Sequence, residues 1–143
     1  NKMKKTAIIV SGYFDPLHKG HIEYFHKARS QGDELFVIIN NDYQRSLKGS
    51  KEFMDQKERL LIINELKLVN KTFLSIDQDQ SVCLTLKKIH KDFANNYNLA
   101  FANGGDQDNS SIPESDICNE LGILLIDGLG KKIQSSSWIL KKK

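Results

Sequence analysis

The stretch Ser11-Gly-Tyr-Phe-Asp-Pro-Leu-His-Lys-Gly-His21 lies between the apolar run Ala7–Val10 and a segment with helical spacing. From Ile22 to Ala28, apolar residues recur every three residues, which is typical of one helix face. A strand is therefore predicted to pass into a helix through a turn that carries one carboxylate and two imidazoles. A helix N-terminus presents unpaired N–H groups and a partial positive charge, so it attracts phosphate. Because His18 and His21 are three residues apart, both can face the same anion, and the turn is predicted to handle phosphate.

The rest of the chain repeats this pattern of a strand followed by a helix. Short apolar runs without strict alternation are typical of strands that are buried on both faces of a parallel sheet. These runs are Ala7–Val10, Leu35–Ile39, Phe73–Ile76, Leu99–Ala102 and Ile123–Ile126. Helices are predicted at about Gly20–Gln31 with a stop at Gly32, from Asp55 through Leu66, from Ser81 through Phe93, from Pro113 to a stop at Gly122, and at about Ser136–Leu140.

The alternation predicts an α/β fold, a single doubly wound domain with a five-stranded parallel sheet and right-handed crossovers. In such sheets, ligands bind beyond the carboxyl ends of the strands, where the strand order reverses. Polar clusters follow the first, second and fourth predicted strands, at Gly12–His21, Asn40–Asp42 and Asn103–Asp106. We therefore expect the functional site at this edge of the sheet.

The composition of the 143-residue chain limits the classes of protein to which it can belong. The formal charge of +3 is a mild excess, and lysines at the two ends carry much of it, which favours solvated termini over a nucleic-acid surface. No apolar run is long enough for a signal-peptide core or a membrane span. Cys83 and Cys118 both fall in apolar helical patterns, so buried free thiols in a reducing compartment are expected. We expect a cytoplasmic protein with no nucleic-acid or membrane partner.

Other roles for the two histidines stay open at this level. Gly12 permits a close approach of the backbone to a ligand, and Gly20 removes a side chain where the helix begins. One histidine could instead cap the helix while the other packs against Tyr24. A zinc site that includes His26 is a further alternative, but the HExxH spacing is absent and His26 lies about 140° around the helix from His21. No set of metal ligands is therefore predicted.

Three segments carry a resemblance to a known family. Gly12–His21 closely resembles the G-x-F-D-x-x-H-x-G-H signature of the cytidylyltransferase-like nucleotidyltransferase superfamily. Asn103-Gly-Gly-Asp106 resembles its G-G-D segment, and Ile133-Gln-Ser-Ser-Ser137 resembles its terminal I-S-[ST]-[ST] motif, which opens a last helix. Among subfamilies, the chain is most similar to the adenylyltransferase domain of ADP-heptose synthesis, followed by glycerol-3-phosphate cytidylyltransferase. The resemblance implies one Rossmann-like, HUP-type nucleotidyltransferase domain over residues 1–143.

The resemblance also implies a reaction and the residues that carry it. ATP or CTP would react with a phosphorylated small molecule, giving a nucleotide-diphospho product and pyrophosphate, with Mg²⁺ carried by the triphosphate and a homodimer as the assembly. His18 and His21 would stabilise the transition state at the α-phosphorus, and Lys48 would bind the reacting phosphates. Nucleotide-binding roles are implied for Gly12, Tyr13, Phe14, Asp15, Gly20, Arg59, Gly104, Gly105, Asp106, Ser135, Ser136 and Ser137. Of these, Asp15 would fix the loop or help to hold the metal.

Several of these residues have simpler alternative roles. Lys48 could be a solvated loop lysine, and Arg59 could pair with Asp55 one helical turn earlier. The chain also departs from the family pattern at two places. Gln134 stands inside the serine motif, and Asn103 stands where relatives often carry a lysine, which weakens the transfer of heptose 1-phosphate specificity. Trp138 could stack on a base or anchor the last helix.

Two other functions compete with the enzyme hypothesis. A nucleotide-binding module without turnover would serve as a sensor or scaffold, but the histidine pair is intact. Class I aminoacyl-tRNA synthetases use a related H-x-G-H site, yet we expect no tRNA-binding appendage here, and the basic surplus is small. The choice between ATP and CTP is left open, because backbone groups in loops would select the base.

Overall fold

A computed structural model describes residues 4–49, 51–103 and 112–127 of the chain. Within these residues, five parallel strands form one sheet with the order β3-β2-β1-β4-β5. The strands are β1 (Lys5–Gly12), β2 (Glu34–Ile39), β3 (Lys71–Leu74), β4 (Tyr97–Ala102) and β5 (Leu124–Ile126). The predicted doubly wound α/β fold with a five-stranded parallel sheet is confirmed. Predictions for Gly104, Gly105, Asp106, Ser135, Ser136, Ser137, Trp138 and the last helix lie outside the described residues.

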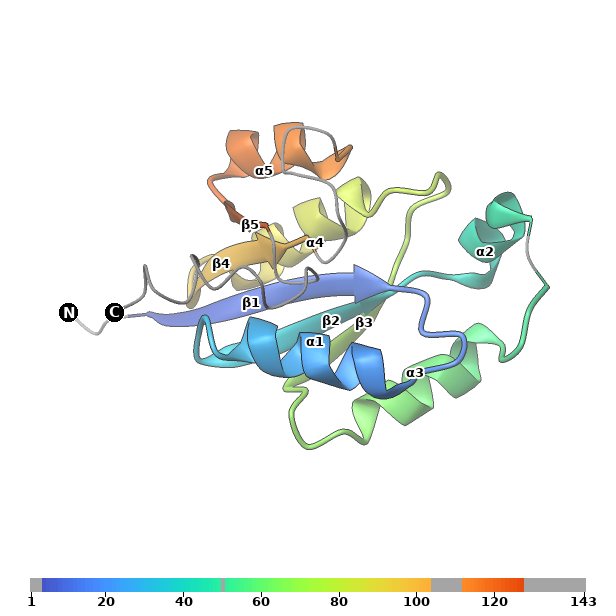
Figure 1. The fold of residues 1–143 in the computed structure, drawn as a ribbon. Helices are drawn as coiled ribbons and strands as arrows, with labels where there is room; N and C mark the ends of the chain where they lie inside the picture. Colours follow the sequence, from blue (N-terminus) through green and yellow to red (C-terminus); the bar gives the residue numbers. More distant parts are fainter. Residues whose placement is uncertain (1–3, 50, 104–111, 128–143) are drawn as a thin grey trace.

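Helices cover both faces of the sheet. They are α1 (Lys19–Arg29), α2 (Asp42–Lys48), α3 (Gln56–Asn64), α4 (Cys83–Phe93) and α5 (Glu114–Leu121). Figure 1 shows α1 and α3 on one face and α4 and α5 on the other, while α2 lies beyond the carboxyl ends of the strands. No described helix has the length and apolar character needed to cross a bilayer.

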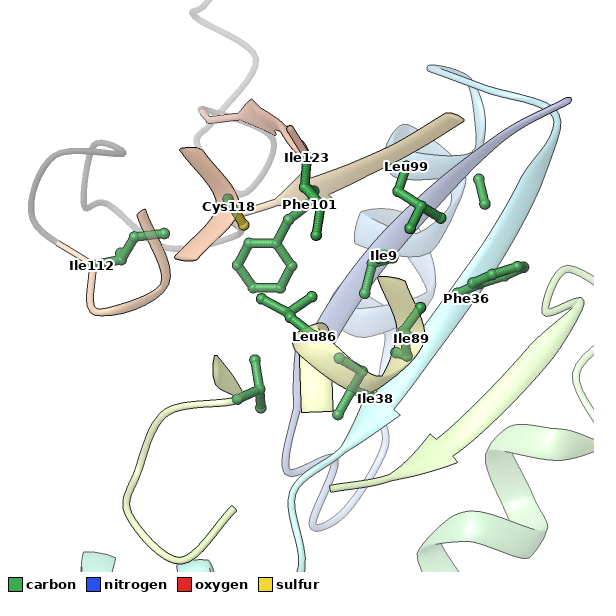
Figure 2. Close-up of a cluster of buried hydrophobic side chains, with 12 residues drawn as sticks. Ile9, Phe36, Ile38, Leu86, Ile89, Leu99, Phe101, Ile112, Cys118 and Ile123 are labelled. Atoms are coloured by element: carbon green, nitrogen blue, oxygen red, sulfur yellow. The ribbon is translucent and has the colours of Figure 1, made fainter. Parts of the chain in front are cut away.

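The apolar runs form two cores because successive side chains of a strand point to opposite faces of a sheet. Ile8 and Val10 of β1 pack with Phe25 of α1 on one face. Ile9 packs with Leu86 of α4 on the other face, in the cluster drawn in Figure 2. Every residue from 7 to 10 is fully buried, which explains the absence of alternation in the sequence.

Several element boundaries differ from the predictions. The third strand is Lys71–Leu74, two residues earlier than expected, and Ile76 after it is half exposed. Helix α4 begins at Cys83, two residues after Ser81, and the Ser81 hydroxyl accepts a hydrogen bond from the Cys83 N–H at 3.3 Å. The buried carboxylate of Asp77 accepts hydrogen bonds from the next two N–H groups, those of Leu84 and Thr85. Gly32 is not a left-handed helix stop. A Cβ at position 32 would lie 2.9 Å from the Thr6 carbonyl oxygen, so this glycine permits close packing against β1.

Helix α2 was not predicted, since the sequence indicated only a loop between the second strand and Asp55. Asn41 caps α2 by accepting from the Gln44 N–H, and the Gln44 side chain accepts from the Asn41 N–H. Gly49 ends the helix with a φ of 78°. This capping box and the terminal glycine were visible in the sequence. An apolar periodicity was not visible, because the apolar residues Tyr43 and Leu47 of this helix are exposed.

Candidate active site

The turn after β1 is anchored by the aromatic ring of Phe14. This residue is buried and has a φ of 53°, in the left-handed region that few side chains adopt. Its ring meets Phe25 and His21 edge to face, with ring centroids 5.3 and 5.0 Å apart. A Cβ on Gly12 would lie 2.7 Å from the Phe14 ring, so a glycine is required there. The turn thus has one defined shape, set by packing beneath α1.

The two histidines cap α1 reciprocally. His18 is the N-cap residue, and its Nδ1 accepts a hydrogen bond from the Gly20 N–H at 3.1 Å. The Nδ1 of His21 accepts from the His18 N–H, also at 3.1 Å. The two rings lie against each other, with centroids 3.9 Å apart. A nitrogen that accepts a hydrogen bond carries no proton, so these contacts place the proton of each neutral imidazole on Nε2.

This tautomer leaves each histidine with an N–H donor at the mouth of the turn. Among the described residues, neither Nε2 has a hydrogen-bond partner. Burial lowers the pKa of His21, and the neighbouring His18 lowers it further. The capping alternative and the phosphate role are therefore compatible, because they use different nitrogens of the same ring. His21 packs against Phe14 rather than Tyr24, whose hydroxyl donates to the Ala102 carbonyl oxygen at 2.9 Å.

Gly20 makes this arrangement possible. A Cβ at position 20 would lie 2.9 Å from Cε1 and 3.1 Å from Nδ1 of His18. Any larger residue would push the imidazole off the helix end. The predicted removal of a side chain at the start of the helix thus serves the capping histidine.

A cavity of about 390 Å³ opens beside the histidines. It lies between the carboxyl ends of β1 and β4, where the strand order reverses. Its volume falls within the range of small-molecule sites, about 300–1,000 Å³. We call it the pocket; it is lined by Ser11, Gly12, Phe14, His21, Tyr24, Gln80, Phe101, Ala102, Asn103, Ile112, Pro113 and Glu114.

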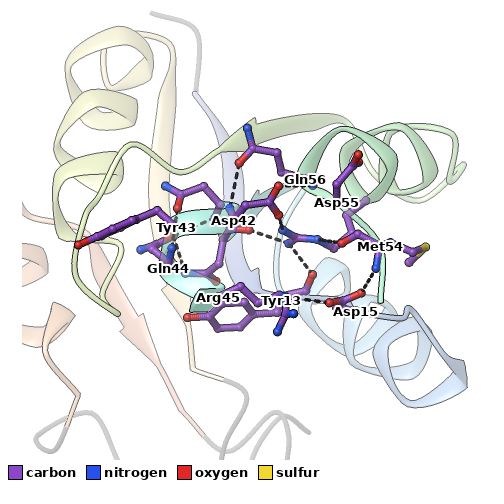
Figure 3. Close-up of polar contacts among 12 residues, drawn as sticks. Tyr13, Asp15, Asp42, Tyr43, Gln44, Arg45, Met54, Asp55 and Gln56 are labelled. Atoms are coloured by element: carbon purple, nitrogen blue, oxygen red, sulfur yellow. Dashed lines mark hydrogen bonds and ion pairs between the residues drawn. The ribbon is translucent and has the colours of Figure 1, made fainter. Parts of the chain in front are cut away.

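A second group of polar residues lies on the β2 side of the turn and is drawn in Figure 3. We call Asp15, Asp42, Arg45, Gln56 and Arg59 the polar cluster. The carboxylate of Asp15 accepts from the Phe53 and Met54 N–H groups at 3.1 and 2.6 Å. It also pairs with Nε of Arg45 at 3.2 Å, and both side chains are almost fully buried. Asp15 therefore joins the turn to α2 and to the segment before α3, which corresponds to the loop-fixing role expected of it.

Arg59 is the centre of this cluster and is fully buried. Its guanidinium donates to the carbonyl oxygens of Met54, Tyr13 and Asn40 at 3.0, 3.0 and 2.6 Å. It also forms an ion pair with Asp42 at 2.6 Å. The alternative pairing with Asp55 is wrong, because the side chain points into the protein while the Asp55 carboxylate caps α3. In this structure the Arg59 donors hold three segments of backbone together.

Lys48 ends α2 and lies across the turn from the pocket. Its Nζ is 4.3 Å from the centre of the Tyr13 ring, a cation–π contact. Lys48 is exposed, so its ammonium group can reach a ligand at the turn. The Tyr13 hydroxyl is buried and has no partner among the described residues.

The structure thus sorts the described site residues into two neighbouring groups. Gly12, Phe14 and His21 line the pocket, with His18 and Gly20 beside them; Tyr13, Asp15, Lys48 and Arg59 lie at the polar cluster. Sequence reasoning missed Arg45 of the polar cluster and Glu114 of the pocket. The described residues contain no group of three or more His, Cys, Asp or Glu side chains placed to hold a metal ion.

Comparison with known proteins agrees with this geometry. The family model described as Cytidylyltransferase-like matches residues 9–123. The FAD synthase of Methanosarcina barkeri is 40% identical over 74 residues, which are 52% of this chain and 52% of that protein. The Bifunctional protein HldE of Wolinella succinogenes is 28% identical over 141 residues, 96% of this chain but 27% of that protein. The aligned part of the chain thus corresponds to about half of the FAD synthase and a quarter of the bifunctional protein.

One solved structure extends the similarity to three dimensions. The lipopolysaccharide core biosynthesis protein from Thermoplasma volcanium superposes with a TM-score of 0.67 and 27% sequence identity. The match covers 86% of this chain and 93% of that one. The family resemblance inferred from the three motifs is confirmed.

Proposed function

Since the chain belongs to the cytidylyltransferase-like family, we propose that it is a nucleotidyltransferase. It transfers AMP or CMP from a nucleoside triphosphate to a phosphorylated small molecule, such as a sugar phosphate or a glycerol phosphate, and releases pyrophosphate. The names of its relatives point toward precursors of lipopolysaccharide or the cell envelope on one side and toward flavins on the other.

The observation that carries this proposal is the locked tautomer of the two histidines. Two Nε2–H donors lie at the N-terminus of α1, beside a pocket that has room for a nucleoside. Backbone N–H groups and the helix dipole favour an anion at the same place. The arrangement suits an α-phosphate at the histidines with its nucleoside in the pocket.

In the proposed reaction, a phosphate oxygen of the acceptor attacks the α-phosphorus in line. A bond forms between that oxygen and the phosphorus, the bond from phosphorus to the α–β bridging oxygen breaks, and its electron pair leaves with pyrophosphate. His18 and His21 donate hydrogen bonds to the α-phosphate oxygens as charge builds on them. Lys48 neutralises the incoming or leaving phosphate charge, so catalysis rests on positioning and electrostatics.

We propose that Mg²⁺ enters with the triphosphate as part of the substrate, where it neutralises phosphate charge. The contacts of Asp15 support this, because both of its carboxylate oxygens already accept hydrogen bonds from backbone N–H groups. The assignments of Gly104, Gly105 and Asp106 to the base and ribose, and of Ser135, Ser136 and Ser137 to the outer phosphates, stay part of the proposal. So do a homodimeric assembly and a location in the cytoplasm, with no nucleic-acid partner.

A pyrophosphate-release assay tests the proposal. ATP and CTP are each combined with glycerol 3-phosphate, sugar 1-phosphates including heptose 1-phosphate, and FMN. We expect turnover with one nucleotide and one acceptor class, and its loss in a His18→Asn, His21→Gln double variant. Tight binding of a triphosphate without turnover on any acceptor would instead support a nucleotide-binding module.

A further inference from the structure

The pocket contains a buried carboxylate that has no part in the reaction described above. Glu114 is the first residue of α5 and is only 8% exposed. It lines the pocket together with His21 and Tyr24 of α1. The helices α1 and α5 cover opposite faces of the sheet (Figure 1), and each contributes to the lining of the pocket, His21 from α1 and Glu114 from α5.

Among the described residues, backbone N–H groups are the only partners of this carboxylate. Oε2 accepts a hydrogen bond from the Val82 N–H at 2.9 Å, and no described cation pairs with the group. Burial raises the pKa of Glu114; hydrogen bonds from the Val82 and Glu114 N–H groups offset part of this, and the carboxylates of Asp77 and Asp79 add to it. A buried carboxylate without a cation partner is unfavourable for the empty protein. A ligand that donates to Oε1 would remove that cost.

The charge pattern of the pocket indicates which end of a nucleotide lies there. Glu114 repels phosphate, whereas the N-terminus of α1 and Lys48 attract it. A nucleotide is therefore oriented with its phosphates at the histidines and its nucleoside toward Glu114. A nucleoside offers N–H and O–H donors to such an acceptor, through its ribose hydroxyls and through the amino group of adenine or cytosine.

On the premise of the proposed function, we propose that Oε1 of Glu114 accepts a hydrogen bond from the nucleoside and is a specificity-determining group. A carboxylate can only accept, so it selects nucleosides that present a donor there. A nucleoside with a keto oxygen or no hydroxyl at that position leaves the carboxylate unpaired, and such mismatches are strongly rejected.

The test is nucleotide binding to the wild-type chain and to Glu114→Gln. The variant keeps an oxygen for the Val82 N–H and places an amide N–H₂ where Oε1 was. Glu120→Gln, an exposed position on the same helix, is the matched control. Dissociation constants are measured for ATP, ITP, 2′-deoxy-ATP, 3′-deoxy-ATP, CTP, UTP and tripolyphosphate.

We expect the wild-type chain to bind ATP or CTP on the order of 10- to 100-fold more tightly than the analogue that lacks the recognised donor. Glu114→Gln should lose that discrimination, while Glu120→Gln keeps it and neither variant loses affinity for tripolyphosphate, which has no nucleoside. Loss of discrimination against ITP or UTP assigns the contact to the base. Loss of discrimination against a deoxy analogue assigns it to the ribose.

The proposal is overturned if the wild-type chain binds all the nucleotides alike, a result that needs no variant to fold. It is also overturned if Glu114→Gln changes the affinity for tripolyphosphate and for every nucleotide by one common factor. These outcomes are separate from the fate of the proposed function, because binding needs no turnover. Discrimination through Glu114 without pyrophosphate release would overturn the transfer reaction and leave this assignment in place.

Discussion

The pocket and the polar cluster lie side by side at one edge of the sheet but use their charged and polar groups in opposite ways. In the polar cluster, Arg59 donates four hydrogen bonds to the protein and the Asp15 carboxylate takes three contacts. In the pocket and beside it, Nε2 of each histidine has no described hydrogen-bond partner and the Glu114 carboxylate has no described cation partner. The satisfied groups of the polar cluster hold segments of backbone together, and the groups without such partners are the ones that we propose contact a ligand.

The largest loss of stability should come from removing the contacts of Arg59 in the polar cluster. Arg59→Met leaves Asp42 and three carbonyl oxygens without their donor, so the free energy of unfolding should fall by about 3–5 kcal/mol. Denaturant unfolding measures this, with the exposed Lys57→Met on the same helix as the control. A variant of normal stability that loses only phosphate affinity would show that Arg59 belongs with the ligand-binding groups.

Removing the Nε2 donors should cost activity but little stability. In His18→Asn the amide oxygen can still cap α1, and in His21→Gln the capping box can be kept, so the free energy of unfolding should change by less than about 1 kcal/mol. Pyrophosphate release should nevertheless fall on the order of 10²-fold or more for each. The exposed His26→Asn serves as the control. Near-normal turnover in both variants would contradict the role given to this pair.

Lys48 should show a smaller loss of turnover with no loss of stability. Because its ammonium rests on the Tyr13 ring and is exposed, Lys48→Met removes a charge without leaving a buried partner. We expect pyrophosphate release to fall at least about 10-fold, the size of one lost transition-state contact of about 1.4 kcal/mol. Lys51→Met is the matched control. Equal effects of the two variants would mean that the loop supplies only a general positive charge.

Gly20→Ala tests whether the shape of the cap matters. Alanine normally stabilises a helix relative to glycine by about 1 kcal/mol, but here its Cβ meets the His18 ring at 2.9 Å. Displacing the capping imidazole costs about as much free energy as alanine contributes, so the stability should not rise. The turnover should fall several-fold. A gain in both stability and turnover would show that the His18 ring can cap α1 from another position.

The smallest expected effect is on how the stability of the fold depends on pH. The folded-state pKa of His21 is lowered, so the unfolded chain binds more protons than the folded chain below about pH 6.5. The contribution of His21 to stability is therefore present above that pH and is lost as the pH falls through the folded-state pKa. The drop in melting temperature between pH 7.5 and pH 5.5 should be larger in the wild-type chain than in His21→Gln. An equal fall in both would remove His21 as the cause.

The sequence predicted much of the fold because its signals are local. Apolar runs marked the strands, and Pro113 and Gly122 marked the ends of α5. Helix α2 was not predicted because its capping residues were not accompanied by a buried apolar stripe. Glu114 was not predicted as a pocket residue, since an acidic residue in the first turn of a helix is common and favourable at the surface.

The sequence by itself determined the alternation of strands and helices, the turn between the first strand and helix, and the family, because each depends on residues close together in the chain. Only the tertiary structure decided which of the polar groups are already satisfied. Arg59 finds its acceptors at Tyr13 and Asn40, and Asp15 finds its donors at Phe53 and Met54, all from other parts of the chain. Whether a charged side chain holds the frame or faces a ligand depends on such distant partners, and packing alone brings them together.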